Sequence, residues 1–511
     1  MKRSVFAFLL TAALALLAVP AINIIIAPGR DAIRLQDKSF LYNMDWASRW
    51  TASALYPMGI STDPKQVIIG KDGWLYLGDL YQQTLSNDRR PATESDDQLD
   101  KEIAAATKTW GAYLETKGVK AFRIMIGPNK GTIYPEHMPS WAKPVASNPT
   151  DALIAQTTGE IYIDLRPTLL KAKETHKEAL YYKTDTHWND LGAALAFRAF
   201  AQQVGEAAPE LRWPSEKAYE VSRVNARNGG DLAKFLRLQG SFSDNDPIIY
   251  GSTPSVEITQ SDFDTKKVLS KGGNPIIGSQ MTPLLVTSTG ALNNKKVLWL
   301  RDSYGNSISP LMDATFSDVL QLHWSEALKP GGRFAQLVED WKPDYVFITV
   351  VERAARDTSF ATYSPPSFSP KSSEFKIART TTQVNIHDLI QSPSKNEYQI
   401  NGVDAFVDFA LSSPIKQVNP QHLNIDLTCT DNTSSVPLQL FWLEAGQASY
   451  DETHSARFSI PTGQHLIDLR TIAKWNPDAV ISRLRVDIDA QNSCSHFILN
   501  NPSLDLKAAG A

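Results

Sequence analysis

Short apolar runs alternate with amphipathic stretches between residues 97 and 351, and this alternation constrains the fold more than any other feature of the sequence. Two segments, 97–118 and 189–205, have the periodicity of amphipathic helices. Apolar runs of strand length lie at 119–127, 160–165, 295–300, 317–324 and 344–351. Strands that alternate with helices usually form a parallel sheet covered by helices on both faces. We therefore predict an α/β domain built on a parallel sheet.

A proline- and serine-rich stretch at 364–373 interrupts this alternation, because its prolines fit neither a helix interior nor a central strand. Beyond it, short alternating apolar runs separated by turn residues replace the helical patterns, which is typical of an antiparallel β-sandwich. A chain of 511 residues also exceeds what a single core usually holds. We predict an α/β domain over 30–363, a linker over 364–373 and a β-sandwich over 374–511.

The N-terminal segment, residues 1–29, has the composition of a membrane helix. Lys2 and Arg3 precede an uncharged, strongly apolar run that ends at Gly29. About 20 apolar residues suffice to cross a bilayer, and the positive flank stays in the cytoplasm, so the rest of the chain would be exported. A cleaved signal peptide, with Val19 and Ala21 as the cleavage pair, is the alternative. We favour an uncleaved anchor, because cleavage there would leave the apolar "INIIIA" at the new terminus.

The chain has only two cysteines, Cys429 and Cys494, and both lie in the predicted sandwich. Disulfides persist in the compartments that exported proteins reach. A bridge between these two residues is one interpretation, and two buried thiols that never meet is the other. The sequence does not fix the separation of the two Cα atoms, so both interpretations stay open.

The stretch "YYKTDTHWND" (181–190) contains the first candidate for chemistry. Side chains two positions apart in an extended segment lie on one face, so Asp185 and His187 can point into the same cleft. A carboxylate in this position can hold the imidazole in one tautomer, as in a Ser-His-Asp triad. The helical pattern that follows makes Asn189 a plausible cap. A metal site and a purely structural pair are the alternatives.

Net charge and motif content argue against a nucleic-acid partner and against a metal site. The formal net charge of −4 gives no basic surface for nucleic acid, so we predict no nucleic-acid partner. A metal at Asp185 and His187 would need further ligands, and no H-E-x-x-H motif or cysteine set accompanies the pair. We therefore predict no metal and no cofactor.

The nucleophile that such a triad requires is Ser303. The segment "KKVLWLRDSYGNSISP" (295–310) is an apolar strand followed by a short polar turn, a context that places a serine at the carboxyl edge of a parallel sheet. Backbone N–H groups at such a turn suit the stabilisation of an oxyanion. Ser303 as a simple helix cap is the alternative interpretation.

Five blocks of sequence together resemble the AlgX/AlgJ family of alginate O-acetyltransferases, whose catalytic domain is SGNH-hydrolase-like. The blocks keep the order of the family and lie within about residues 65–355; they are 67–79, 126–139, 181–193, 229–236 and 298–307. The region after 374 resembles the carbohydrate-binding sandwich that follows the catalytic domain in AlgX. The resemblance implies an SGNH-like parallel-sheet domain followed by a carbohydrate-binding-module-like sandwich.

The resemblance also implies roles for individual residues. Asp185 would orient the imidazole, His187 would act as the general base, and Ser303 would be the nucleophile. Arg301 stands where ordinary SGNH enzymes have the glycine of "GDS", so only the Ser303 backbone is assigned to the oxyanion hole. The further candidates for binding the oxyanion or the substrate are Asn129, Lys130, Arg301, Tyr304 and Arg353.

Each further candidate has a structural alternative. Asn129 in "GPNK" could simply form a turn, and Arg353 could pair with Glu352 or Asp344. Among the twelve tryptophans, Trp188 and Trp324 lie nearest the site in sequence and could stack on sugar rings, although most tryptophans belong to cores.

Three functions are consistent with these patterns. The first is a periplasmic, membrane-anchored O-acetyltransferase acting on an exopolysaccharide or surface glycan through an acetyl-serine. The resemblance implies a membrane-bound acyltransferase as the acetyl donor and other exopolysaccharide assembly proteins as partners. The second is an acetyl esterase with the same triad, and the third is a non-catalytic glycan-binding assembly protein.

Overall fold

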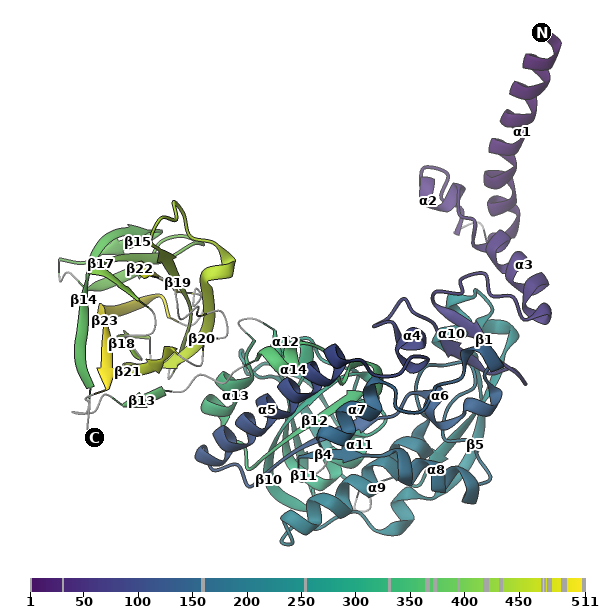
Figure 1. Cartoon of the computed structure of the whole chain (residues 1–511). Coiled ribbons are helices and arrows are strands. Elements are labelled where there is room, and N and C mark those ends of the chain that lie inside the picture. Colours follow the sequence, from purple (N-terminus) through teal and green to yellow (C-terminus); the bar gives the residue numbers. More distant parts are fainter. Residues whose placement is uncertain are drawn as a thin grey trace.

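The structure is a computed structural model. It describes residues 2–29, 32–157, 161–251, 255–329, 332–363, 368–370, 375–393, 396–416, 422–431, 435–469, 472, 475, 480–488 and 494–507. A long N-terminal helix, an α/β region and a β-rich C-terminal region follow one another along the chain (Figure 1).

An eight-stranded mixed sheet forms the centre of the α/β region. Its strands, in spatial order, are β4 (Tyr162–Asp164), β3 (Ala121–Gly127), β12 (Tyr345–Val351), β10 (Asn293–Arg301), β11 (Phe316–Leu322), β9 (Leu284–Thr289), β7 (Glu257–Asp262) and β8 (Val268–Lys271). The first five are parallel and are the five predicted strands. The last three are antiparallel, so the prediction of a purely parallel sheet was wrong at this edge.

Helices cover both faces of the parallel strands, as predicted. On one face, Phe347 of β12 packs against Phe200 of α9 (Asp190–Ala207), with ring centroids 4.8 Å apart. On the other, Phe122 of β3 contacts Trp110 of α5 (Glu94–Thr116). The parallel strands lie between these two layers of helices, so neither face of the sheet is open to water there. For this reason β12 is buried at every position.

The remaining elements of the α/β region are short. The helices are α4 (Thr84–Asp88), α6 (Lys130–Ile133), α7 (Pro149–Gln156), α8 (Arg166–Thr175), α10 (Asp231–Phe235), α11 (Ser309–Thr315), α12 (Trp324–Leu328), α13 (Phe334–Trp341) and α14 (Ser359–Thr362). Two hairpins flank the sheet: β1 (Val67–Ile69) with β2 (Leu75–Leu77), and β5 (Val221–Asn228) with β6 (Ser243–Ile249).

The N-terminal helix α1 (Lys2–Ile26) contains a segment, Val5–Ile26, that is long and apolar enough to cross a membrane by length and composition. A signal sequence has the same properties, so the helix is compatible with either interpretation of residues 1–29. Two short helices follow it, α2 (Lys38–Leu41) and α3 (Asp45–Leu55).

The C-terminal region consists of antiparallel strands, as predicted. They are β13 (Phe368–Pro370), β14 (Phe375–His387), β15 (Leu389–Gln391), β16 (Glu397–Ile400), β17 (Phe406–Lys416), β18 (His422–Cys429), β19 (Ser435–Glu444), β20 (Ser455–Pro461), β21 (Gly463–Asp468), β22 (Val480–Ile488) and β23 (His496–Lys507). Their buried side chains form one apolar cluster, separate from the core of the α/β region. Most of the predicted linker lies outside the described residues, but β13 within it pairs with β21.

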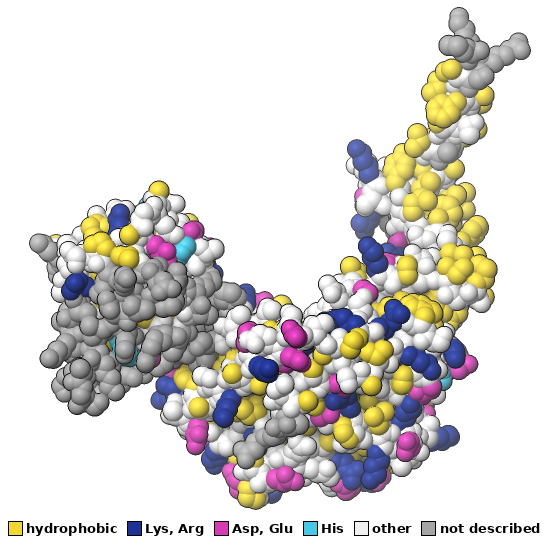
Figure 2. Space-filling view, in the orientation of Figure 1, with side chains coloured by type: hydrophobic (Ala, Val, Ile, Leu, Met, Phe, Trp, Pro, Cys, Tyr) yellow, Lys and Arg dark blue, Asp and Glu magenta, His cyan; other side chains and the backbone are white. Residues whose placement is uncertain are grey.

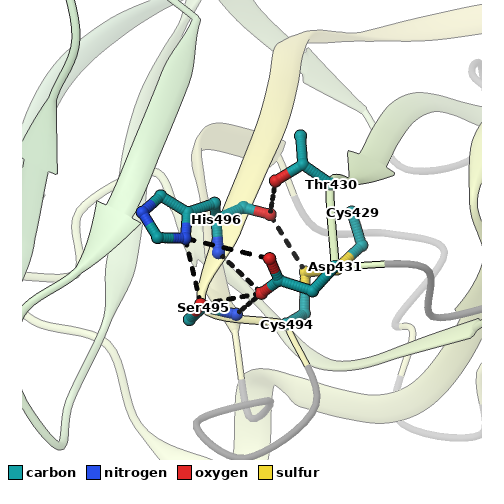
Figure 3. Close-up of a disulfide and its surroundings, with 6 residues drawn as sticks. All are labelled: Cys429, Thr430, Asp431, Cys494, Ser495 and His496. Carbon is teal, nitrogen blue, oxygen red and sulfur yellow. Dashed lines mark hydrogen bonds and ion pairs between the residues drawn. A yellow bond between two sulfur atoms is a disulfide. The ribbon is translucent and has the colours of Figure 1, made fainter.

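A disulfide joins Cys429, at the end of β18, to Cys494, just before β23, with the two Cα atoms 5.7 Å apart (Figure 3). Hydrogen bonds hold the same two segments together beside it. Thr430 donates from its backbone nitrogen and from Oγ1 to the carbonyl of His496, at 3.0 and 3.1 Å. Of the two interpretations of the cysteines, the bridge is the one that the structure contains.

Replacing both cysteines by serine is expected to lower the free energy of unfolding of the C-terminal region by about 4 kcal/mol. The bridge closes a loop across a sequence separation of 65, so its loss restores chain entropy to the unfolded state. Chemical denaturation of the full chain, followed by the fluorescence of buried Trp442, measures the effect. Addition of a reductant to the double variant is the control, and unchanged midpoints in variant and parent would contradict the prediction.

Candidate active site

Ser303 lies in a turn directly after β10, at the carboxyl edge of the parallel strands. The neighbouring Asp302 fixes this turn with hydrogen bonds to three groups. Its carboxylate accepts from the backbone nitrogens of Tyr304 and Val351, at 2.9 and 2.7 Å, and from the indole nitrogen of Trp324 at 3.3 Å. Asp302 is therefore the cap of the short 3-10 turn, and the alternative in which Ser303 serves only as a cap does not hold.

The structure brings the three predicted triad side chains together. Nε2 of His187 lies 2.8 Å from Oγ of Ser303, and Nδ1 of His187 lies 2.7 Å from Oδ1 of Asp185. An ionised carboxylate can only accept, so Nδ1 carries the proton and Nε2 is left to accept from the serine hydroxyl. This is the protonation state that a general base needs before it activates a serine.

The Asp185 carboxylate is buried, and it interacts with the side chains of His187 and Arg227. Burial alone would raise the pKa of Asp185, but the hydrogen bond and charge of His187 hold that pKa well below its usual range. Arg227 adds to this effect, with Nη2 3.2 Å from Oδ2. The carboxylate is therefore ionised at neutral pH and can stabilise a positive charge on the imidazole.

Lys130 is bonded to the backbone of the loop that carries Asp185. Its ammonium is buried and donates to the carbonyl oxygens of Tyr182, Lys183 and Asp185, at 3.0, 2.8 and 2.6 Å. Burial lowers the pKa of Lys130 to about 7. Because all three protons of the ammonium point at backbone carbonyls, this side chain positions the loop and is not directed at a substrate. The prediction that Lys130 binds the oxyanion or the substrate is therefore corrected.

The segment Gly229–Gly230–Asp231 holds the other side of the same loop. Oδ1 of Asp231 accepts from the backbone nitrogen of Thr186 at 2.7 Å, and the backbone nitrogen of Gly230 donates to Oγ1 of Thr184 at 2.8 Å. Burial, followed by the charge of Asp185, raises the pKa of Asp231. The loop that carries Asp185 and His187 is thus fixed by contacts on both sides.

Asp231 also completes a set of possible metal ligands, since one ligand atom each from Asp185, His187 and Asp231 lie within 4.8 Å of one another. This third ligand was not foreseen from the sequence. Both ring nitrogens of His187 and both oxygens of Asp231 already take part in hydrogen bonds, so a metal would have to displace those bonds.

Replacing Gly230 by alanine is expected to lower catalytic activity roughly 100-fold, a loss typical of a displacement of about 1 Å in a site. A Cβ at position 230 would lie 2.4 Å from both Cβ and Oδ2 of Asp185, so the triad carboxylate would have to move. Hydrolysis of a chromogenic acetyl ester measures the effect. Gly240→Ala is the matched control, because no atom lies within 4 Å of its new Cβ. Equal activity in the two variants would contradict the prediction.

Arg301 lies two positions before Ser303, and its side chain is bonded within the protein interior. Its guanidinium is fully buried and donates to Oε1 of Gln321 at 2.8 Å and to the carbonyls of Ile277 and Gly278, at 2.9 and 2.8 Å. Burial lowers the pKa of Arg301 to about 10, which still leaves it charged at neutral pH. Arg301 therefore braces the loop at 277–278, and its prediction as a substrate-binding residue is corrected.

Tyr304 and Arg353 lie against one another beside the site. Tyr304 is fully buried, and its hydroxyl donates to the carbonyl of Thr186 at 3.1 Å, so it links the serine turn to the histidine loop. The guanidinium carbon of Arg353 lies 5.9 Å from the centre of the Tyr304 ring. Among the described residues, Arg353 makes no ion pair with Glu352 or Asp344, so that alternative is not supported.

Asn129 follows β3 at the same edge of the sheet. Its backbone nitrogen donates to Oε2 of Glu352 at 2.6 Å, which fixes the turn. Its side-chain Nδ2 is buried and has no hydrogen-bond partner among the described residues. A buried donor without a partner is costly, and such groups often mark functional sites. Asn129, Thr186 and Arg353 line one small cavity of about 30 Å³.

A second, open pocket of about 360 Å³ is lined by Ser303 and His187. Tyr182, Arg227, Asp246 and Ile276 contribute to its wall. The guanidinium of Arg227 stacks 3.9 Å from the centre of the Tyr182 ring, and the Tyr182 hydroxyl donates to Asp246 at 2.6 Å. The two tryptophans considered for sugar stacking, Trp188 and Trp324, are buried in the core and do not serve this role.

Several residues that shape the site were not predicted. Asp302 follows Arg301 directly and lies within the block 298–307 without a predicted role. Asp231 belongs to the "GGDLAKFL" block, which was recognised without a role for its aspartate. For Asp302 and Asp231, the sequence signal was an acidic residue inside a block that resembles the AlgX/AlgJ family. Arg227 lies in a polar stretch with no pattern that distinguishes it.

The fold and this geometry together define an α/β domain with a Ser-His-Asp constellation at the carboxyl edge of its sheet. Residues 67–279 match the model of a family described as the SGNH hydrolase-like domain of the acetyltransferase AlgX. The resemblance to the AlgX/AlgJ family that the sequence blocks indicated is thus confirmed. The matched region contains Asp185 and His187 and ends before Ser303.

Curated relatives and solved structures give further matches. "Probable alginate O-acetylase AlgJ" of Pseudomonas fluorescens is 26% identical over 258 residues, 50% of this chain and 58% of the relative. Its counterpart from Pseudomonas aeruginosa is 32% identical over 185 residues, 35% and 43% of the two chains. The chain thus spans about half the length of these relatives. A solved structure of Pseudomonas aeruginosa AlgX is 14% identical and covers 90% of this chain and 99% of its own, with a TM-score of 0.40.

Proposed function

We propose that this protein is an O-acetyltransferase that acetylates a polysaccharide through an acetyl-serine intermediate on Ser303. The observation that carries the proposal is the hydrogen-bonded chain from Ser303 through His187 to Asp185, with distances of 2.8 and 2.7 Å. The match to the AlgX acetyltransferase domain and the names of the AlgJ relatives support transfer of an acetyl group and an exopolysaccharide of the alginate kind as acceptor.

In the first half-reaction, Oγ of Ser303 attacks the carbonyl carbon of an acetyl ester while its proton passes to Nε2 of His187. The tetrahedral intermediate collapses, the bond to the leaving group breaks, and His187 returns the proton to the leaving oxygen. Asp185 stabilises the transient imidazolium, and Arg227 keeps Asp185 in its ionised form.

In the second half-reaction, a sugar hydroxyl in the open pocket attacks the acetyl-serine and gives its proton to His187. The acetyl–Ser303 bond breaks, and Ser303 takes the proton back. Transfer exceeds hydrolysis only where the pocket holds a sugar hydroxyl in the place that water would otherwise take. Tyr182 and Arg227 offer a flat polar surface there, which suits a sugar ring.

The oxyanion of both tetrahedral intermediates needs hydrogen-bond donors. We assign the backbone N–H of Ser303 to this role, since the adjacent N–H of Tyr304 is already bound to Asp302. The unpartnered Nδ2 of Asn129 is the second donor in this proposal. Burial and the missing partner support the role of Asn129 over a purely structural turn.

The setting of the reaction is part of the proposal. We place residues 30–363 and 374–511 in the periplasm, held at the inner membrane by α1 as an uncleaved anchor. A membrane-bound acyltransferase would supply the acetyl group, and other exopolysaccharide assembly proteins would be partners. The C-terminal region would act as a carbohydrate-binding sandwich that retains the polymer near the site.

Incubation of the purified full chain with a chromogenic acetyl ester, with and without oligosaccharides from candidate polymers, tests the proposal. We expect oligosaccharide addition to give acetylated sugar, detected by mass spectrometry, together with faster release of the chromophore. Hydrolysis that continues without any sugar product would support an acetyl esterase. Glycan binding without turnover would support a non-catalytic assembly protein.

A further inference from the structure

Six exposed apolar side chains occur between residues 35 and 60, in the segment that follows the N-terminal helix, and we call these residues the juxtamembrane patch. Its members are Leu35, Tyr42, Met44, Trp50, Met58 and Ile60. Trp50 is 74% exposed, which is unusual for the largest apolar side chain. Figure 2 shows hydrophobic side chains that continue from α1 towards the adjoining surface of the α/β region. An apolar surface of this kind indicates an interaction.

The patch is attached to the end of the membrane helix. Asn23, one turn before the end of α1 at Ile26, is buried, and its Nδ2 donates to the carbonyls of Leu41 and Asn43, at 2.8 and 2.9 Å. These bonds hold the segment between α2 and α3 beside the last turn of α1. If α1 spans a bilayer, the patch therefore lies at the level where the chain leaves the lipid.

Basic and aromatic residues surround the patch. An open hollow of about 820 Å³ lies between the end of α1, the helix α3 and the residues after α10. Trp46, Arg49, Lys234 and Arg237 are among the residues that line it. Tryptophan and tyrosine are enriched at the headgroup level of membranes, and basic side chains there are attracted to anionic lipids.

We propose that residues 35–60 dock on the anionic lipid surface from which α1 emerges, and that this contact sets the orientation of the active site towards the membrane. The proposal rests on the membrane anchor of the proposed function and adds a second, peripheral contact to it. Lipid is favoured as the occupant because the patch is continuous with the spanning helix and carries exposed cationic groups, Lys38 and Arg49, beside its apolar side chains.

The docked segment is connected to the catalytic loop through one short helix. Ala52 of α3 belongs to the same buried cluster as Leu232 of α10 and Leu236, which directly follows that helix. The first residue of α10, Asp231, binds the backbone of Thr186, next to His187. α10, a helix of five residues, thus packs against α3 and bonds to the loop that carries His187.

Site-directed spin labelling of the full chain in vesicles of phosphatidylethanolamine and phosphatidylglycerol tests the proposal. The native chain has no free thiol, so one introduced cysteine carries the only label. Labels are placed by Trp50→Cys and, independently, by Met58→Cys, because one of the two variants could fold poorly. Leu14→Cys in α1 is the control for insertion, and Leu170→Cys, an exposed apolar position in α8, is the control for water.

Accessibility to oxygen and to a nickel chelate gives the depth of each label. We expect the labels at Trp50 and Met58 to lie about 5 to 10 Å below the headgroup level, while Leu170 reads as aqueous. Equal values at Trp50, Met58 and Leu170, with Leu14 inside the bilayer, would overturn docking and leave the anchor intact. Labels shielded from both reagents would identify a protein partner instead of lipid. A water-exposed Leu14 would refute the anchor itself and the docking that rests on it.

The same readout separates this inference from the proposed catalysis. Label depth does not depend on turnover, so an inactive protein can still show docking. Conversely, Trp50→Ser is expected to keep its rate with a water-soluble acetyl ester, since Trp50 does not contact the triad, while the label at Met58 moves towards water. An unchanged depth at Met58 in that variant would contradict a role for Trp50 in docking.

Discussion

Ser303→Ala is expected to lower the rate of acetyl transfer and of acetyl-ester hydrolysis by roughly 10⁴-fold or more, as loss of a triad nucleophile does elsewhere. The fold should tolerate the change, because Asp302 and not Ser303 holds the turn together. Initial rates with a chromogenic ester measure the loss. Mass spectrometry of the parent protein after brief exposure to the ester should show an acetyl group on the peptide that contains Ser303.

The matched control is Ser317→Ala, a serine at the surface of β11 that bonds Lys295 and Asn294 and lies outside the pocket. This variant should keep the activity of the parent. Acetylation that persists undiminished in cells producing only Ser303→Ala would remove the catalytic assignment, and the glycan-binding alternative would then stand.

Asp185→Asn is expected to lower the rate about 10⁴-fold with little change in stability of the α/β fold. The amide lacks the negative charge that stabilises the imidazolium, and its NH₂ group can leave the imidazole in the tautomer that cannot take the proton from Ser303. It also leaves Arg227 without its charged partner. Rates measured across a pH series separate this effect from a change in substrate binding.

Asp72→Asn provides a matched control, because Oδ2 of Asp72 lies 3.2 Å from Nδ1 of His137 in an exposed Asp–His pair away from the site. The control should keep the activity of the parent at every pH. If Asp185→Asn lost less than tenfold, Asp185 would be structural and the histidine would have to be oriented by another group, either the Thr186 hydroxyl, 3.1 Å from Nδ1, or the Asp231 carboxylate, 3.8 Å from it.

The parallel part of the fold could be predicted because its strands are buried on both faces. Runs such as 344–351 are apolar at every position, and a run of that length flanked by helical patterns has few other interpretations. The strands β7 and β8 escaped prediction because they lie at the edge, where β8 is exposed at all four positions and carries no apolar pattern. The change from parallel to antiparallel pairing at β9 cannot be recognised from the amino-acid composition of that strand.

The proximity of Asp185 and His187 could also be predicted, but the surroundings of these residues could not. Asp185 and His187 are close in sequence, so the geometry of an extended chain already puts them on one face. Lys130 and Arg301 were candidates for binding the oxyanion or the substrate because they lie within blocks that resemble the AlgX/AlgJ family. In the structure both are buried, and most of the groups that accept their hydrogen bonds are backbone carbonyls. No sequence pattern shows which carbonyls a buried cation will find.

The three bonds of Lys130 have a consequence for which positions of this loop can change without moving His187. Every residue type supplies a carbonyl, so the loop keeps its three anchor points whichever side chains occupy positions 182 and 183. Tyr182 faces the open pocket, where an acceptor sugar would bind. Under the proposed function, a substitution at position 182 would therefore change the surface offered to the acceptor while the backbone contacts that position His187 stay the same.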